Sequence, residues 1–149
     1  MFELNADLRR DCFVIGNFPL CCMLAMNDAN FPWFILVPKR ADVREIYQLN
    51  IADQQQLLCE SSYVAQQLAL EFNADKINIA ALGNITPQLH VHHIVRYRSD
   101  PAWPKPVWGQ QPATPYTAIQ RADLITRLKH SLTRDLVFLD PTPASHPLT

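Results

Sequence analysis

Three of the chain's five histidines lie within four positions, at His90, His92 and His93. The apolar residues among them alternate as they do in a β-strand, whose successive side chains point to opposite faces. Positions 88, 90, 92, 94 and 96 are therefore predicted to share one face, which presents Gln88, His90, His92 and Arg96 together. Two imidazoles, an amide and a guanidinium on one face are suited to phosphate chemistry, because they can attack phosphorus and bind its oxygens.

The loop before this strand adds to the pattern. A neutral imidazole can attack phosphorus to give a covalent intermediate, while a second imidazole binds an oxygen or assists the leaving group. Residues 82–86 precede the histidines directly, and their backbone N–H groups can form an anion-binding nest. Gly83 lets the backbone approach a phosphate closely. The sequence thus favours nucleophilic catalysis at phosphorus.

Metal binding and a structural role are the two other functions that these histidines could serve. His90 and His92 can face one metal ion, but zinc requires at least a third protein ligand. Their face offers only Gln88 and Arg96, and a guanidinium repels a divalent cation, so no metal site is expected. His93 falls on the opposite face among apolar neighbours. We therefore predict that His93 is a neutral, hydrogen-bonded core residue.

Composition limits the classes of partner. The chain has 149 residues, 48% hydrophobic content and a net charge of −1. One globular domain over residues 1–149 is expected, and neither a nucleic-acid polymer nor a membrane is an expected partner. The chain has neither a signal-peptide pattern nor an apolar run near the ~20 residues of a membrane span, so a cytoplasmic location is expected. The four cysteines lack paired zinc-ligand spacing and are expected to be reduced and structural.

Hydrophobic periodicity predicts the elements that must position these residues. Strands are expected at 13–15, 20–26, 33–37, 77–81 and 88–97, and helices at 42–49, 50–73 and 116–132. The second and third strands, and the fourth and fifth, read as hairpins. Hairpins without βαβ crossovers predict an α+β fold, an antiparallel sheet of about five strands with helices packed on one side. Residues 140–149 are expected to form an extended tail.

Residues 88–96 resemble the histidine-triad (HIT) motif, in which three histidines alternate with apolar residues and an arginine often lies four residues beyond the third. Arg96 has that relation to His92. In this register His90 takes the middle, nucleophilic position, His92 the third, and Gln88 stands where the first histidine usually is. A competing register starts at His90 and makes His92 the nucleophile. Its third member would be Ile94, which cannot hydrogen-bond to a phosphate.

The resemblance covers roughly residues 12–109. Residues 26–40 resemble the family's first hairpin, although Pro32-Trp33-Phe34 replaces the usual Pro-Gly-His, so that histidine is missing. Asn78 and the Gly83-Asn84 loop resemble the ribose- and phosphate-binding stretch. Residues 101–109 resemble the family's tail of tryptophan and proline. The chain is most similar to the bacterial branch described as diadenosine tetraphosphate (Ap4A) hydrolase-like.

This resemblance implies a HIT-like fold, commonly a homodimer whose two sheets join. It also implies hydrolysis or transfer at the α-phosphate of a small nucleotide, either a dinucleoside polyphosphate or a phosphoramidate, through a nucleotidyl-histidine intermediate. No cofactor is required, though some branches use a magnesium-bound substrate. Two alternatives stay open. Gln88 and the missing hairpin histidine motivate a non-catalytic nucleotide-binding or sensing module, and His90 and His92 with a distant acid would make a metalloprotein.

Roles are carried over from the resemblance residue by residue. His90 attacks the phosphorus, His92 binds a phosphate or bridging oxygen, and Gln88 orients or contacts the phosphate. The remaining substrate-binding candidates are Asn84 with the backbone of Gly83 and Ile85 for the developing charge, Asn27 and Asn78 for the ribose, Arg96, and Trp103 or Trp108 for stacking on a base. For Arg96 a solvent-facing position or an ion pair with an acid is the alternative.

Overall fold

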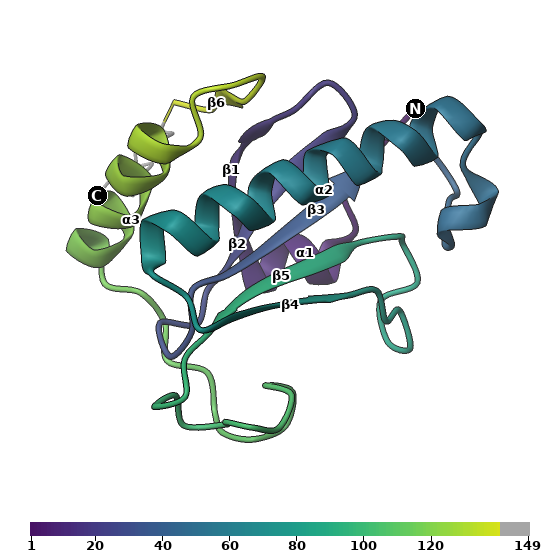
Figure 1. Cartoon of the computed structure of the whole chain (residues 1–149). Coiled ribbons are helices and arrows are strands. Elements are labelled where there is room, and N and C mark those ends of the chain that lie inside the picture. The colour runs from purple at the N-terminus through teal and green to yellow at the C-terminus, as the bar shows by residue number, and fades with distance from the viewer. Residues whose placement is uncertain (141–149) are drawn as a thin grey trace, which may run out of the picture.

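The computed structural model describes residues 1–140 and contains one antiparallel sheet of six strands in the order β4-β5-β3-β2-β1-β6 (Figure 1). The elements are α1 (Ala6–Asp11), β1 (Cys12–Asn17), β2 (Cys21–Met26), β3 (Trp33–Pro38), the 3₁₀ helix η1 (Ile46–Gln48), α2 (Ile51–Phe72), β4 (Lys76–Ala80), β5 (Val91–Arg96), α3 (Ala118–Ser131) and β6 (Val137–Phe138). The predicted α+β class and both predicted hairpins, β2–β3 and β4–β5, are confirmed. Because β3 also pairs with β5, the two hairpins form one continuous sheet.

Both faces of the sheet are covered. α2 crosses one face with α3 beside it, and α1 lies on the opposite side (Figure 1). Val91 and Val95 of β5 pack toward α2 and α3, whereas Ile94 packs with Leu8 of α1 and with Val107. The expectation of helices on one side only is therefore wrong. A helix of six residues such as α1 is too short to show a clear period in the sequence.

Local signals define α2 well. The side chain of Asn50 accepts a hydrogen bond from the backbone N–H of Asp53 at 2.8 Å and caps the helix. The helix ends at Asn73, which adopts the left-handed conformation with φ of 48°. Its buried apolar residues recur at helical spacing and are Leu57, Val64, Leu68 and Phe72. The predicted helix over 50–73 is confirmed.

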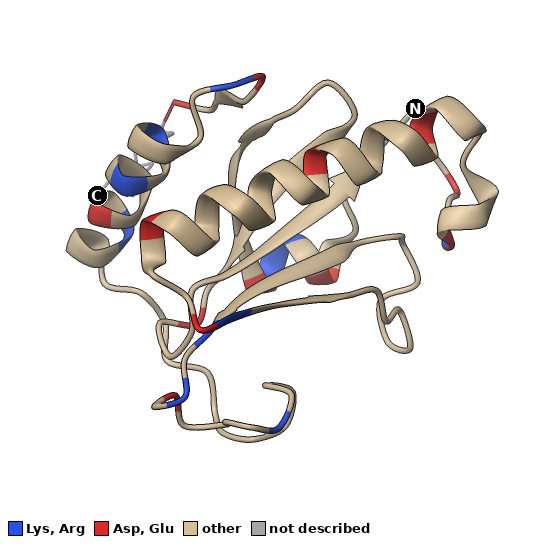
Figure 2. Cartoon of the chain, in the orientation of Figure 1, with Lys and Arg blue, Asp and Glu red and all other residues tan. Residues whose placement is uncertain are grey.

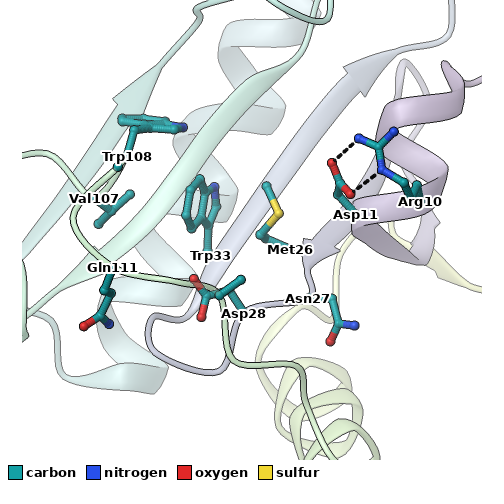
Figure 3. Close-up of a pocket in the computed structure, with 11 residues that line it drawn as sticks. Arg10, Asp11, Met26, Asn27, Asp28, Trp33, Val107, Trp108 and Gln111 are labelled. Carbon is teal, nitrogen blue, oxygen red and sulfur yellow. Dashed lines mark hydrogen bonds and ion pairs between the residues drawn. The ribbon is translucent and has the colours of Figure 1, made fainter.

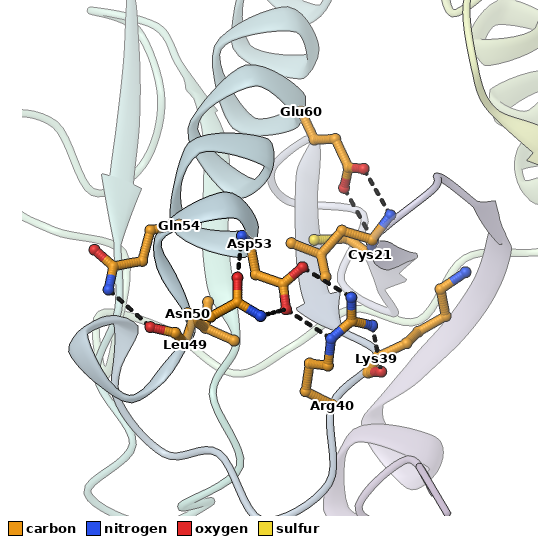
Figure 4. A network of polar contacts seen from close by, with 9 residues as sticks. Cys21, Lys39, Arg40, Leu49, Asn50, Asp53, Gln54 and Glu60 are labelled. Carbon is orange, nitrogen blue, oxygen red and sulfur yellow. Dashed lines mark hydrogen bonds and ion pairs between the residues drawn. The ribbon is translucent and has the colours of Figure 1, made fainter.

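Polar side chains of α2 anchor it to the β1–β2 turn and to the chain after β3 (Figure 4). Arg40 forms a bidentate ion pair with Asp53, with N–O distances of 2.7 and 2.8 Å. Glu60 is buried, and its two carboxylate oxygens accept hydrogen bonds from the N–H groups of Leu20 and Cys21. These partners satisfy a buried carboxylate and fix the helix across the sheet.

The predicted helix over 42–49 is wrong apart from one 3₁₀ turn. Asp42 has a φ of 56°, so it does not adopt the extended conformation of an N-cap residue. The capping box is formed by Glu45 and Gln48 instead. A second difference is that β5 begins at Val91 rather than at residue 88, so the peptide at Gln88 lies outside the regular strand.

β6 was not predicted, because two residues carry no periodicity. It pairs with Gly16 and Asn17 at the edge of the sheet. A Cβ at position 16 would lie 2.4 Å from the carbonyl oxygen of Val137, so only glycine permits this approach. α3 confirms the predicted C-terminal helix, and Thr117 caps it. Of the predicted tail, residues 141–149 lie outside the described part of the chain.

Charged side chains of both signs are mixed on α1, α3 and the loops, whereas α2 carries acidic side chains only (Figure 2). Within residues 1–140, no helix combines the length and the apolar character that crossing a bilayer requires.

Candidate active site

The paired histidines face a pocket of about 310 Å³ between α1, the loop before β5 and the segment after it. We call it the histidine pocket. Its lining residues are Asp7, Leu8, Asp11, Cys12, Met26, Leu82, Gly83, Asn84, Ile85, Thr86, His90, His92 and Trp108. Six of the predicted site residues are thus brought together, namely Gly83, Asn84, Ile85, His90, His92 and Trp108.

A backbone carbonyl sets the tautomer of the neutral His90 ring. Nδ1 of His90 lies 2.7 Å from the carbonyl oxygen of Gln88. Because a carbonyl oxygen only accepts hydrogen bonds, Nδ1 must carry the proton. Nε2 then retains its lone pair. The His90 imidazole is therefore arranged as a nucleophile.

His92 has the opposite tautomer. The indole N–H of Trp33 donates to Nδ1 of His92 at 2.9 Å. An indole N–H only donates, so Nδ1 is the acceptor and the proton of the neutral ring lies on Nε2. Burial, and then the neighbouring His90 and His93, lower the pKa of His92 to about 3. His92 is thus a neutral hydrogen-bond donor, with its ring centroid 4.9 Å from that of His90.

His93 lies on the other face of β5, as predicted. Its Nδ1 lies 3.1 Å from the carbonyl oxygen of Val91, and its Nε2 lies 2.7 Å from the hydroxyl of Ser61 on α2. Burial lowers its pKa to about 4, although the hydrogen bond to Val91 opposes the shift. The prediction of a neutral structural histidine is confirmed.

Two tryptophans enclose His92. The ring centroid of Trp108 lies 5.0 Å from that of His92 and 5.5 Å from that of Trp33, each in an edge-to-face arrangement. Of the two tryptophans proposed for stacking, Trp108 lies at the site. Trp103 lies elsewhere, with its ring 5.7 Å from the guanidinium carbon of Arg96.

A second pocket of about 370 Å³ adjoins the first across Asp11, Met26 and Trp108. In it, Trp33 and Trp108 lie on one side and Arg10, bonded to Asp11, on the other (Figure 3). We call it the adjacent pocket. Asn27 lies here rather than beside the histidines, and its side-chain oxygen accepts a hydrogen bond from the N–H of Tyr116 at 2.9 Å.

Arg96 and Asn78 do not line either pocket. Arg96 is 1% exposed and forms a bidentate ion pair with Asp100 at 2.7 and 3.1 Å. It also donates to the side-chain oxygen of Asn78 at 2.7 Å and to the carbonyl of Lys105 at 2.8 Å. This cluster joins β4 and β5 to the segment that carries Trp108. The alternative prediction for Arg96, an ion pair with an acid, therefore describes its position. The positions of Arg96, Asn78 and Trp103 do not support their assignment to substrate binding.

The side chain of Gln88 also points away from the histidine pocket. Its amide accepts from the N–H of Asn5 and donates to the carbonyl of Glu3, both at 2.9 Å. In this conformation, the amide of Gln88 does not contact a phosphate bound at His90. The backbone carbonyl of Gln88 acts on His90 instead.

Several lining residues were not identified from the sequence. Asp7 and Asp11 on α1 both pair with Arg10, each at 2.8 Å. Burial, and then Asp11, raise the pKa of the Cys12 thiol to about 12, so it stays protonated. Trp33 belongs to the Pro32-Trp33-Phe34 segment that replaces the family's usual Pro-Gly-His, and that substitution was the one signal in the sequence for its role. Within residues 1–140, no three His, Cys, Asp or Glu side chains gather as a metal site.

Comparisons with known proteins agree with this geometry. The family model described as the HIT domain matches residues 8–99. A histidine triad protein from Marinobacter aquaeolei VT8 is 50% identical, with a TM-score of 0.89 over 91% of this chain and 98% of that one. Histidine triad proteins from Sinorhizobium meliloti 1021 and Bradyrhizobium japonicum are 45% and 43% identical, with TM-scores of 0.86 and 0.85. They cover 88% and 87% of this chain and 97% of each of those chains. No curated protein matches the chain. The expected HIT-like fold is confirmed.

The position of Arg96 predicts a role in stability. Arg96→Met leaves the buried carboxylate of Asp100 without its partner and should lower the free energy of unfolding by about 3–5 kcal/mol. Arg98→Met, at a neighbouring exposed position, should change it by no more than about 0.5 kcal/mol. Urea denaturation followed by circular dichroism measures both. A stable Arg96→Met protein with weakened nucleotide binding would restore the substrate-binding assignment.

The lowered pKa values of His92 and His93 predict acid sensitivity. Below about pH 6.5 the unfolded chain takes up protons on both histidines, while the native state does not until about pH 4 for His93 and pH 3 for His92. The free energy of unfolding should therefore fall with decreasing pH, by about 1.4 kcal/mol per pH unit for each histidine. Urea denaturation between pH 7.5 and 5 measures this slope. His93→Gln should remove the contribution of one histidine to this slope, whereas His130→Gln, at an exposed position on α3, should leave the slope unchanged. Equal slopes in all three proteins would contradict the assignment.

Proposed function

The chain belongs to the histidine-triad (HIT) family, and on that premise we propose that it cleaves small nucleotides at the α-phosphate through a nucleotidyl intermediate on His90. The observation that carries this proposal is the pair of opposite tautomers. His90 presents a bare Nε2 to the histidine pocket, and His92 beside it presents an N–H. A nucleophile and a fixed donor side by side are what displacement at phosphorus requires.

In the first step, the lone pair on Nε2 of His90 attacks the α-phosphorus. The bond to the leaving group breaks, and the ring of His90 becomes a phosphorylated imidazolium. Its Nδ1–H stays bonded to the carbonyl of Gln88, which is 2.7 Å away and stabilises the new positive charge. Water then attacks the phosphorus and loses a proton to the solvent, and the P–N bond breaks to return the lone pair to Nε2.

The loop before β5 supports the phosphate. Gly83 has a φ of 94°, a left-handed conformation that orients the following peptide groups. Asn84 and the backbone of Ile85 line the same pocket as both histidines. Thr86 donates to the side chain of Asp7 at 3.1 Å and joins this loop to α1. We propose that Asn84 and these N–H groups stabilise the oxyanion.

The nucleoside is proposed to occupy the adjacent pocket, since that pocket meets the histidine pocket at Met26 and Trp108. The carboxylate of Asp28 accepts hydrogen bonds from Asn30 and Thr114 through one oxygen, Oδ1. Among the described residues its other oxygen accepts none, which suits a ribose hydroxyl. The apolar and aromatic walls suit the base.

The charges that line the histidine pocket affect which substrate it can bind. The histidine pocket is lined by the carboxylates of Asp7 and Asp11, and no Lys or Arg of residues 1–140 lines it. A dinucleoside polyphosphate would therefore bind with magnesium carried on its phosphates, whereas a phosphoramidate of one phosphate would not need it. The second candidate is a nucleotide-binding module without turnover, which the outward amide of Gln88 and the missing hairpin histidine favour.

Turnover by two variants separates these candidates. His90→Asn should abolish hydrolysis of Ap4A with Mg²⁺ and of adenosine phosphoramidates, while the Kd for AMP changes little. His92→Asn should lower kcat by ~10²–10³, the usual effect of losing one transition-state donor. His130→Asn, distant from the pocket, is the control. Chromatographic detection of released AMP measures all four proteins. Hydrolysis retained by His90→Asn would reject the nucleophile, and no hydrolysis by the wild type would favour the binding module.

We also propose that the protein forms a homodimer through β4. Among the strands of residues 1–140, β4 pairs with β5 alone and lies at the end of the sheet. Ile79 on β4 is 52% exposed and Leu58 on α2 is 67% exposed, and both line an apolar groove with Ile46. An unpaired strand edge beside an apolar groove is suited to a second copy that extends the sheet.

Light scattering in line with gel filtration tests the dimer. The wild type should have twice the chain mass of 17.0 kDa. Ile79→Lys should shift it to the monomer, because the substitution places a charge against the partner strand. Ile119→Lys is the matched control, an isoleucine that is 76% exposed on α3 and should leave the dimer intact. A wild type that elutes as a monomer at micromolar concentration would reject the proposal.

A further inference from the structure

We infer that Trp33 holds His92 as a fixed hydrogen-bond donor and so leaves the site without a general acid, which makes the enzyme selective for nucleotide anhydrides over nucleotide amides. This inference rests on the proposed function at His90 and narrows its substrate class. It concerns the chemical nature of the leaving group. A carboxylate or phosphate departs without a proton, whereas an alkylamine does not.

The contact between Trp33 and His92 has one possible polarity. Trp33 begins β3, pairs with Ile94 in the sheet register and is buried. Its N–H lies 2.9 Å from Nδ1 of His92, and an indole offers no acceptor in return. Nδ1 therefore always accepts. A histidine in place of Trp33 could exchange its proton with His92, but a tryptophan cannot.

The surroundings of His92 oppose the imidazolium that a general acid requires. A proton on Nδ1 would place two donors face to face and break the bond from Trp33. Burial between Trp33 and Trp108 removes water from the ring, so its pKa lies near 3. His90 is 4.9 Å away on the same face, and a charge on both rings would be repulsive. His93 faces α2 on the other side of the sheet.

The remaining titratable groups of the pocket do not supply the proton either. Asp7 and Asp11 approach from α1, but both carboxylates are bonded to Arg10 at 2.8 Å. The thiol of Cys12 stays protonated with a pKa of about 12 and is too weak an acid to release its proton during turnover. His90 holds its only proton on Nδ1, directed at the carbonyl of Gln88.

The leaving group must therefore take the electron pair of its broken bond to phosphorus without receiving a proton from the protein. A carboxylate or phosphate leaving group does so readily, because it is a far weaker base than the anion of an alkylamine. The N–H on Nε2 of His92 stabilises the departing oxygen by a hydrogen bond and keeps its proton. An alkylamine leaving group would have to be protonated on nitrogen by the solvent first, which is slow at neutral pH. General acid catalysis typically raises the rate by 10²–10⁴-fold. Its absence is expected to slow the cleavage of amides and to leave the cleavage of anhydrides unchanged.

Two substrates with a common AMP group test this selectivity. One is acetyl adenylate, a mixed anhydride, and the other is AMP N-propylamidate. Trp33→His supplies a titratable partner for His92. It should raise kcat/KM for the amidate, and so lower the ratio of kcat/KM for the anhydride to kcat/KM for the amidate by about 10²-fold. Tyr47→His introduces a histidine at an exposed position on η1 and should leave the ratio unchanged. An unchanged ratio in a folded Trp33→His protein would overturn the inference.

Nitrogen-15 NMR of the imidazoles gives a readout that needs no turnover. In the wild type, His92 should be protonated on Nε2 alone from pH 5 to pH 8. Trp33→Phe keeps an aromatic ring but removes the donor, and the Nδ1 signal of His92 should then shift and show exchange between tautomers. A wild-type His92 protonated on both nitrogens at pH 7 would overturn the inference. If the wild type cleaves neither substrate, the proposed function fails, while this spectrum still decides the role of Trp33.

Discussion

The hydrogen bond from Nδ1 of His90 to the carbonyl oxygen of Gln88 determines what the site can do. It requires the peptide at residue 88 to turn its oxygen toward a side chain two residues later. Three contacts hold this peptide in place. The N–H of Leu89 donates to Val43, and the amide of Gln88 bonds to Glu3 and Asn5 of the N-terminal segment. Because the bond to His90 uses only the backbone, a glutamine can occupy the position that usually holds a histidine.

The sheet then gives neighbouring histidines different tasks. Alternation along β5 directs His92 into the pocket and His93 under α2, although the two are adjacent in sequence. Each imidazole is buried in its neutral form, which avoids the cost of desolvating a charge. Each is also bonded to a partner that fixes its tautomer, Trp33 for His92 and the carbonyl of Val91 for His93. The same physical rule therefore produces a hydrogen-bond donor that faces the pocket on one face and a core residue on the other.

The sequence predicted the parts of the site that depend on local order. Two-residue alternation separated His92 from His93, and Gly83 marked a loop that lies beside the histidines because it directly precedes them. Arg96 was placed on the correct face, but its ion pair with an acid was predicted only as the alternative to substrate binding, because alternation does not show what lies above a side chain. Asp100, an acid four residues beyond it, was the available signal for a buried ion pair.

The residues that enclose the site could not be predicted from local sequence patterns. Asp7 and Trp108 lie beyond opposite ends of the region that the family model matches, residues 8–99, and they meet at the pocket only because the sheet is folded between two layers. Trp33 lies on β3, which pairs with β5, and it contacts His92, which is 59 residues later in the sequence. Neither strand's own sequence indicates how the two strands are aligned with each other. The unexpected position of α1 has the same origin, since a short helix is placed by what it covers.

A covalent adduct tests the nucleophile at His90 most directly. The protein is mixed with acetyl adenylate, quenched in base within the first turnover and digested, and the peptides are sequenced by mass spectrometry. The expected result is AMP on the peptide that contains residues 88–96, attached to Nε2 of His90 and released by acid. AMP on His92 or another residue, or a burst of free AMP with no adduct on any peptide, would contradict it.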